Sequence, residues 1–218
     1  MHASHSSKRP ATQEKLEGNE LEDGHVEEFL ASFAKKVLVF PDGPSVLCIL
    51  APVGLIGSGK STVMQALAER FSLVVIRTDA IRAHLNRFGY NNRRTPELAG
   101  RLVVSCVERG YGVAVDADVV VEEKRSALQR IARELEVPLV SVHINTPEEV
   151  ILDRLRPDNP DREFKGPEAV ERYFIRKTLH ENLDIPFECV VDGAGELETE
   201  MDKAEVCIRK ALSQKTPR

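Results

Sequence analysis

The sequence is poor in aromatic residues and in cysteine. Among 218 residues there is no tryptophan, only three are tyrosine and four are cysteine, and aromatic residues make up 5%. A surface on which nucleic-acid bases stack needs aromatic rings, so the composition disfavours such a surface. The cysteines form no C-x-x-C pair, and Cys48 and Cys106 lie in apolar runs, as small core residues do. This pattern argues against a zinc site and for a reducing compartment.

Long apolar runs and a hydrophobic leader are also missing. No run approaches the roughly 20 residues that span a membrane, and the polar N-terminus has no apolar region of the signal-peptide kind. We therefore expect a cytoplasmic protein. A composition of 42% hydrophobic and 30% charged residues is that of a globular protein, and 218 residues suffice for one α/β domain with a substantial core.

Charge is unevenly distributed along a chain whose formal net charge is −5. Residues 77–109 contain only three acids, whereas their arginines are Arg77, Arg82, Arg87, Arg93, Arg94, Arg101 and Arg109. A basic segment in an acidic protein can mark an anionic substrate. Alternatively, these arginines lie on solvated helix faces, and the sequence leaves both interpretations open.

Residues 45–61, SVLCILAPVGLIGSGKS, carry the most specific pattern. Residues 46–50 are apolar and predict a buried strand, and helical spacing follows, with Val63, Leu67 and Phe71 on one face. Between strand and helix, Gly54-Leu55-Ile56-Gly57-Ser58-Gly59-Lys60-Ser61 fits G-x-x-x-x-G-K-[ST], the phosphate-binding loop or P-loop. The strand before it and the helix after it disfavour the alternative, a glycine-rich loop that only turns the chain.

Each fixed position of the P-loop has a chemical reason. Glycines let the backbone approach phosphate oxygens, and successive N–H groups at a helix N-terminus bind anions. Lys60 is a cation aimed at the outer phosphates, and the Ser61 hydroxyl is a magnesium ligand. We therefore predict ATP and Mg²⁺ as cofactors, with Gly54 to Ser61 and the adjoining Thr62 as the nucleotide-binding residues.

Strands and helices alternate after the P-loop. The expected strands are residues 73–77, 112–115, 139–144 and 187–191, and the expected helices are residues 80–87, 95–109, 122–136, 147–155, 167–180 and 197–212. This alternation predicts a parallel sheet with helices on both faces, whose ligand binds at the C-terminal strand ends. Ahead of the domain (residues 45–214) we expect a disordered tail over residues 1–24 and a helix and turn over residues 25–44.

Two acids follow predicted strands. Asp116 ends the third strand, where a Walker B acid holds magnesium, and Asp118 is its nearby competitor. Asp79 follows the second strand, and Arg82, three residues on, projects from the same face of a helix start. Asp79 either caps that helix or acts as a general base on an acceptor hydroxyl. In the second case Arg82 holds an anionic part of the acceptor.

A polar, proline-rich loop follows the helix that is predicted to begin with Thr-Pro-Glu-Glu, residues 146–149, as a capping box. Arg154, Arg156 and Arg162 lie at the end of that helix and in the loop, and residues 154–166 predict a short lid. A mobile arginine that closes onto a transferred phosphoryl group stabilises its charge and excludes water. The alternative is a solvated run of charges.

The stretches GLIGSGKST, TDAIR, VAVDAD and VHINTPEEVILDRLR are together similar to the P-loop kinases of the polynucleotide-kinase and zeta-toxin type, also described as predicted kinases or AAA-family ATPases. The resemblance covers about residues 46–212. It implies a three-layer α/β P-loop fold whose five-stranded parallel sheet has the order 2-3-1-4-5. It also implies that Asp79 is the general base, that Arg82 meets the acceptor, and that residues 191–196 flank adenine. Lid arginines that contact phosphate map onto Arg154 and onto Arg162 or Arg156.

These features predict an ATP-dependent kinase that phosphorylates a hydroxyl. A small-molecule acceptor (a metabolite, nucleoside or antibiotic) fits the compact acceptor region and the missing stacking platform. A polynucleotide 5′-hydroxyl, which fits the basic residues 77–109, is the alternative. A hypothesis of another class is a nucleotide-dependent switch or regulatory ATPase. A third is a protein that binds ATP without turnover, which intact Lys60, Ser61, Asp79 and Asp116 disfavour.

Overall fold

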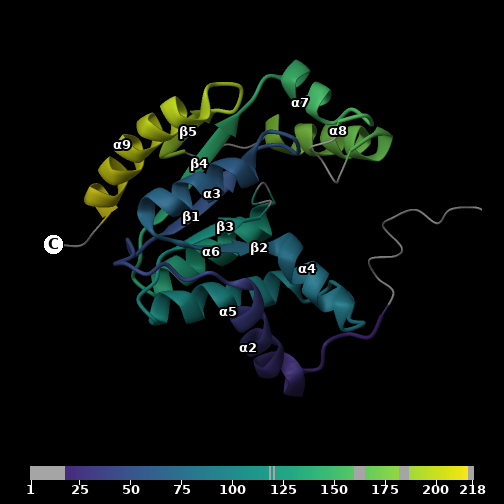
Figure 1. The fold of residues 1–218 in the computed structure, drawn as a ribbon, viewed down its shortest axis with the longest axis vertical. Helices are drawn as coiled ribbons and strands as arrows, with labels where there is room; N and C mark the ends of the chain where they lie inside the picture. Colours follow the sequence, from purple (N-terminus) through teal and green to yellow (C-terminus); the bar gives the residue numbers. More distant parts are fainter. Residues whose placement is uncertain (1–17, 118, 120, 160–164, 182–186, 216–218) are drawn as a thin grey trace, which may run out of the picture.

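A five-stranded parallel sheet forms the centre of the computed structural model, which describes residues 18–117, 119, 121–159, 165–181 and 187–215 (Figure 1). Its strands are β1 (Ile49–Val53), β2 (Val74–Arg77), β3 (Val113–Asp116), β4 (Leu139–Asn145) and β5 (Cys189–Asp192). They are arranged in the order β2-β3-β1-β4-β5, and every neighbouring pair is parallel. The predicted fold and strand order are therefore confirmed.

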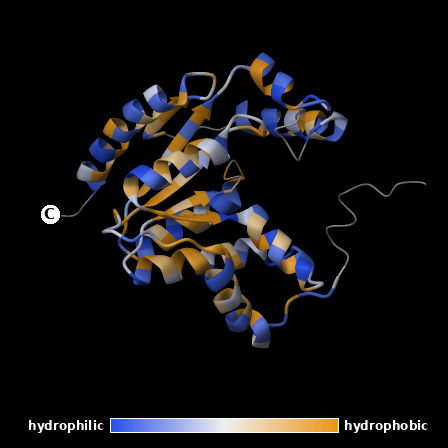
Figure 2. Ribbon diagram, viewed as in Figure 1, coloured by the Kyte–Doolittle hydropathy of each residue, from blue (hydrophilic) through white to orange (hydrophobic). Residues whose placement is uncertain are grey.

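Helices cover both faces of this sheet. The helices of the domain are α3 (Lys60–Phe71), α4 (Thr78–Arg87), α5 (Thr95–Glu108), α6 (Glu122–Glu134), α7 (Glu148–Arg154), α8 (Pro167–Glu181) and α9 (Leu197–Lys215). Alternate residues of β1 face opposite ways: Leu50 packs in one core with α3 and α9, whereas Ile49 and Ala51 pack in another with α5 and α6. The strands and the inward helix faces are apolar (Figure 2), which gives three layers.

The first strand lies three residues later than the sequence predicted. Its pairing with β3 ends at Leu50, but its pairing with β4 continues through Pro52 to Val53. Proline lacks the backbone N–H that would serve a second neighbour. The chain therefore passes directly from the buried end of β1 to Gly54, the first P-loop residue.

The N-terminal part is ordered over a longer stretch than predicted. Residues 1–17 lie outside the described residues, but the expected tail over residues 18–24 is wrong. Leu21 is only 2% exposed, Asn19 forms a parallel bridge with Tyr90, and the short helix η1 (Asp23–His25) leads into α2 (Val26–Val37). A single apolar anchor among acidic neighbours is too weak a pattern to be recognised in the sequence.

Two cysteines behave as the sequence predicted. Cys48 and Cys106 are buried, and their burial raises the pKa of the Cys48 thiol to about 12 and that of the Cys106 thiol to about 11. A thiol with such a pKa is a poor nucleophile and metal ligand, so both are core residues. In the described part of the chain, no helix combines the length and the apolar character that crossing a bilayer requires.

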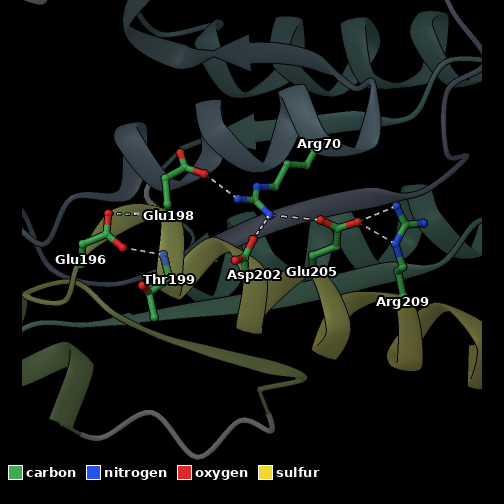
Figure 3. A network of polar contacts seen from close by, with 7 residues as sticks. All are labelled: Arg70, Glu196, Glu198, Thr199, Asp202, Glu205 and Arg209. Carbon is green, nitrogen blue, oxygen red and sulfur yellow. Dashed lines mark hydrogen bonds and ion pairs between the residues drawn. The ribbon is translucent and has the colours of Figure 1, made fainter.

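A network of ion pairs connects α9, the last helix, to α3, the helix that follows the P-loop (Figure 3). Arg70, one residue before the end of α3, contacts three acids of α9: Glu198 at 2.7 Å, Asp202 at 2.6 Å and Glu205 at 3.2 Å. Ion pairs at the protein surface contribute little to stability, so the network orients more than it stabilises. It holds the start of α9 against α3, and thereby the turn that precedes α9 beside the P-loop.

A buried histidine lies where α2 packs on α4. His84 is 6% exposed, and its ring lies edge-on to three aromatic rings, with centroids 5.0–5.4 Å away. These rings belong to Phe29, Phe33 and Phe88. The N-terminal helix is thus packed onto the helix that carries Asp79 and Arg82.

This packing predicts a pH-dependent stability. Burial, together with the charges of Lys36 and Arg87, lowers the pKa of His84 below its usual value. The unfolded chain therefore binds the proton more readily, and the free energy of unfolding falls as the pH drops below about 6.5. We expect a smaller fall in His84→Phe, measured by thermal unfolding between about pH 7.5 and pH 5. His143, whose pKa is also lowered, is present in wild type and in His84→Phe and therefore does not account for a difference between them. An equal fall in the free energy of unfolding of the two proteins would contradict the assignment to His84.

Candidate active site

The P-loop has the backbone that its glycines predict. Gly57 and Gly59 have φ values of +88° and +98°, in the left-handed region that side chains disfavour. Gly59 is the N-cap of α3 and accepts the Val63 N–H at 3.0 Å. Gly54 permits a close approach instead, because a Cβ there would lie 2.8 Å from the Ser58 hydroxyl. The loop therefore curls around the N-terminus of a helix, where backbone N–H groups attract anions.

The polar side chains of the loop agree with an anion site. Lys60, the first residue of α3, donates from Nζ to the Leu55 carbonyl at 2.8 Å, so its charge lies against the loop. Ser61 and Thr62 are exposed in the first turn of α3. The Ser58 hydroxyl is buried with no hydrogen-bond partner among the described residues. A buried polar group in that state is costly, and a loop that encloses a ligand is a recognised setting for it.

Asp116 lies where the sequence placed it, at the C-terminal end of β3. Its side chain is 12% exposed, and Oδ2 is 3.5 Å from Nε of Arg77, its neighbour in the β2–β3 register. The Thr78 hydroxyl donates to the Asp116 carbonyl at 3.3 Å. This largely buried carboxylate lies at the C-terminal edge of the sheet, from which the P-loop also leaves. Its competitor Asp118 lies outside the described residues.

Asp79 does not cap its helix. Helix α4 begins at Thr78, its N-cap is Arg77, and no side chain makes a capping hydrogen bond. Asp79 is the second helical residue, its side chain is 85% exposed, and it is paired with Arg82, as the D-x-x-R spacing predicts. The capping alternative is therefore wrong, and the Asp79 carboxylate is available to a ligand at the C-terminal edge of the sheet.

Arg154 joins the P-loop to the turn after β5. Its Nη1 donates to the carbonyls of Gly57 and Ser58, at 3.3 Å each, and its Nη2 donates to Gly193 at 2.7 Å. Arg154 thus lies at the P-loop. Arg156 instead pairs with Asp153 at 3.2 Å, and both side chains are about two-thirds exposed. Arg162 lies outside the described residues.

Thr146 has a role that the sequence did not predict. The expected capping box is wrong, because α7 begins at Glu148 with Pro147 as its N-cap and has no side-chain cap. The Thr146 hydroxyl instead donates to the Ser58 carbonyl at 2.8 Å. The local Thr-Pro-Glu-Glu pattern could not reveal a partner 88 residues away.

A cavity of about 340 Å³ opens between the P-loop and the turn after β5. Its walls include Gly59 and Thr62, Arg154 and Asn159, and residues 191–193. Glu200, only 8% exposed, accepts the Asp192 N–H at 2.9 Å, and its hydrogen bond with Lys203 lowers the pKa of its carboxyl. The segment that the family resemblance assigns to adenine therefore lines a defined space next to the phosphate loop.

Gly193 lines this cavity, and a side chain at its position would collide with neighbouring residues. A Cβ at Gly193 would lie 1.9 Å from the Thr146 hydroxyl and 2.6 Å from the Ser58 carbonyl, so Gly193→Ala must push the turn away from the P-loop. We expect the free energy of unfolding to fall by about 1–3 kcal/mol and the affinity for ATP to weaken. Denaturant unfolding and calorimetric ATP titration measure the two effects. Gly43→Ala is the control, since a Cβ there meets nothing within 4 Å; equal effects in both variants would refute the contact.

The donor set at the site fits magnesium. The Ser61 hydroxyl and the Asp116 carboxylate are the hard oxygen ligands that Mg²⁺ prefers, and this ion keeps several waters rather than a full protein cage. Among the described residues there is no group of three or more histidine, cysteine or acidic side chains that could hold a metal ion.

The fold and the glycine-lined loop define a P-loop nucleotide-binding domain. Residues 49–193 match the AAA domain family, and the chain therefore belongs to it. No curated protein sequence matches the chain.

Solved structures with the same fold include several kinases. A gluconokinase from Sinorhizobium meliloti 1021 is 20% identical with a TM-score of 0.54 over 78% of this chain and 95% of its own. APS kinase CysC of Mycobacterium tuberculosis, in complex with AMPPNP and APS, is 18% identical with a TM-score of 0.55 over 76% and 99%. A sugar kinase from Janibacter sp. HTCC2649 is 16% identical with a TM-score of 0.56 over 79% and 100%. At such identities the likeness shows a shared fold.

Proposed function

We propose that the chain is a kinase that transfers the γ-phosphoryl group of ATP to a hydroxyl of a small-molecule acceptor. The observation that carries the proposal is the meeting of three features at one edge of the sheet: the P-loop after β1, Asp116 at the end of β3, and the Asp79–Arg82 pair after β2. Two of the solved structures with this fold are named as a gluconokinase and a sugar kinase, which supports the same class.

The side chains have distinct roles in this reaction. The P-loop N–H groups and Lys60 bind the β- and γ-phosphates. Ser61 and Asp116 hold Mg²⁺, which neutralises charge on the phosphates when bound. Asp79 accepts the proton of the acceptor hydroxyl on a carboxylate oxygen as that hydroxyl attacks the γ-phosphorus, while the bond from this phosphorus to the β–γ bridging oxygen breaks and ADP leaves. Arg82 orients the acceptor. Arg154, already at the loop, stabilises the charge of the transferred group.

The domain assignment follows from these roles. We propose residues 45–214 as the kinase domain, in which residues 154–166 form the lid and Arg162 is a second phosphate-contacting arginine. The subtype suggested by the sequence, close to polynucleotide kinases and zeta toxins, belongs to the same proposal. Its specific signature is the D-x-x-R pair, which the structure presents with 85% of the Asp79 side chain exposed.

A panel of acceptors tests the proposal. Labelled γ-phosphate from magnesium-ATP is followed onto nucleosides, sugars, aminoglycoside and phenicol antibiotics, and 5′-hydroxyl oligonucleotides. Transfer to a small molecule supports the proposal, whereas transfer to the oligonucleotides alone favours a polynucleotide kinase. Release of free phosphate at one rate with every acceptor would favour a regulatory ATPase instead.

A further inference from the structure

Six of the seven arginines in residues 77–109 contact an acid or an aromatic ring of the chain. Among the arginines of this segment, Arg77 contacts Asp116, Arg82 contacts Asp79, and the Arg109 guanidinium lies 4.3 Å from the centre of the Phe40 ring. Arg87, the last residue of α4, is exposed. The other three, between the α4–α5 loop and the middle of α5, are Arg93, Arg94 and Arg101, and they form what we call the basic face. Each of them meets an acid from the N-terminal part of the chain.

These acids come from residues 18–28, the acidic segment. It contains five acidic residues and no lysine or arginine. Glu20 lies 3.6 Å from Arg93, Asp23 lies 2.8 Å from Arg94, and Glu27 is paired with Arg101. The basic face is thus matched, arginine by arginine, by one continuous stretch of the same chain.

The acidic segment is held in place by contacts other than its charges. Leu21 and Val26 are 2% and 1% exposed and belong to the core. The backbone of the segment also binds: the Asn91 N–H donates to the Asn19 carbonyl at 2.9 Å, and Arg94 donates to the Leu21 carbonyl at 2.7 Å. Apolar burial and backbone hydrogen bonds therefore account for docking.

The paired acids add little to this docking. The side chains of Glu20, Asp23 and Glu27 are 53%, 96% and 77% exposed, and ion pairs this open contribute little to stability. Their larger effect is on the electrostatic field, because each places a negative charge beside an arginine of the basic face. Glu97 of α5 also pairs with Arg94 at 2.7 Å and lies 4.0 Å from Arg101.

We propose that Glu20, Asp23 and Glu27 are specificity determinants that mask the basic face and so keep single-stranded nucleic acid off helices α4 and α5. Helix α4, which carries Asp79 and Arg82 at its N-terminal end, leads into the loop that carries Arg93 and Arg94. The proposal rests on the proposed function and deepens it, since it gives a physical reason for a small-molecule kinase with seven arginines in residues 77–109 to bind polynucleotides weakly. The three acids confer specificity by weakening the binding of a polyanion, not by strengthening the binding of the small acceptor.

Neutralising the acids without removing the segment tests the idea. The variant Glu20→Gln/Asp23→Asn/Glu27→Gln keeps Leu21, Val26 and the backbone contacts. Its matched control, Glu136→Gln/Glu168→Gln/Glu171→Gln, changes the net charge equally at exposed acids elsewhere. Binding of a fluorescently labelled single-stranded oligonucleotide is followed by anisotropy without ATP, and thermal unfolding verifies that all three proteins are folded.

We expect the neutralised variant to bind the oligonucleotide at least about tenfold more tightly than wild type or control at about 50 mM salt. If three phosphates are engaged, affinity should fall about 20-fold on going to about 200 mM salt, because counterions are released on binding. Equal affinity in all three proteins, or an equal gain in the control, would overturn the proposal. A variant that loses stability but gains no binding would show that the acids only hold the segment.

The assay separates this inference from the proposed function. It needs no turnover, so a protein that phosphorylates nothing in the acceptor panel can still show or fail to show the masking. Conversely, a wild type that transfers phosphate to a small molecule and binds the oligonucleotide as tightly as the neutralised variant would leave the kinase proposal intact and refute the masking.

Discussion

Replacing Asp79 by asparagine is expected to slow phosphoryl transfer by about 10²–10⁴-fold while leaving ATP affinity unchanged. The amide keeps the size of the carboxylate but cannot accept the acceptor proton. The Asp79 side chain is 85% exposed and caps no helix, so the substitution should not disturb the fold. The measurements are kcat with the acceptor found in the panel, and the Kd of ATP by calorimetry.

The chain offers a matched control for this substitution. Asp153 is also followed three residues later by an arginine that it contacts, Arg156, and its side chain is 65% exposed. Asp153→Asn should keep the wild-type kcat. If both variants lose activity equally, or if Asp79→Asn retains it, Asp79 is not the base. Phosphate release that is the same in wild type and Asp79→Asn with every acceptor would favour the regulatory ATPase.

Replacing Lys60 by methionine is expected to lower kcat by about 10²–10³-fold and to weaken ATP binding as well. The ammonium is the one P-loop side chain that brings a positive charge to the outer phosphates, and methionine keeps the stem but not the charge. The effect on both constants distinguishes Lys60 from Asp79, whose loss should affect kcat alone. Single-turnover kinetics and ATP titration separate the two effects.

Lys210→Met provides the control for Lys60→Met. Lys210 is an exposed residue of α9, so the variant makes the same chemical change away from the P-loop. We expect wild-type ATP affinity and kcat from it. Unchanged ATP binding and transfer in Lys60→Met would argue that the loop does not hold the phosphates, and would count against the kinase and the ATPase alike.

The site depends on both local pattern and long-range packing. The P-loop and the position of Asp116 at a strand end could be predicted because each follows from neighbouring residues: glycines that allow positive φ, and an apolar strand that ends in an acid. The D-x-x-R pair is equally local, since Asp79 and Arg82 share one helix face. The neighbouring residues did not reveal whether Asp79 caps the helix, because capping depends on the exact residue at which α4 begins.

The sequence by itself determined the elements, the phosphate-binding loop and, through its family resemblance, the strand order. These depend on residue spacing, which the chain carries wherever it folds. Only the tertiary structure decided that Thr146 and Arg154 meet the P-loop carbonyls, that Gly193 leaves room for them, and that the acids of residues 18–28 lie on the basic face. Those partners are 39 or more residues apart, so their meeting follows from how the layers pack and leaves no local pattern in the sequence.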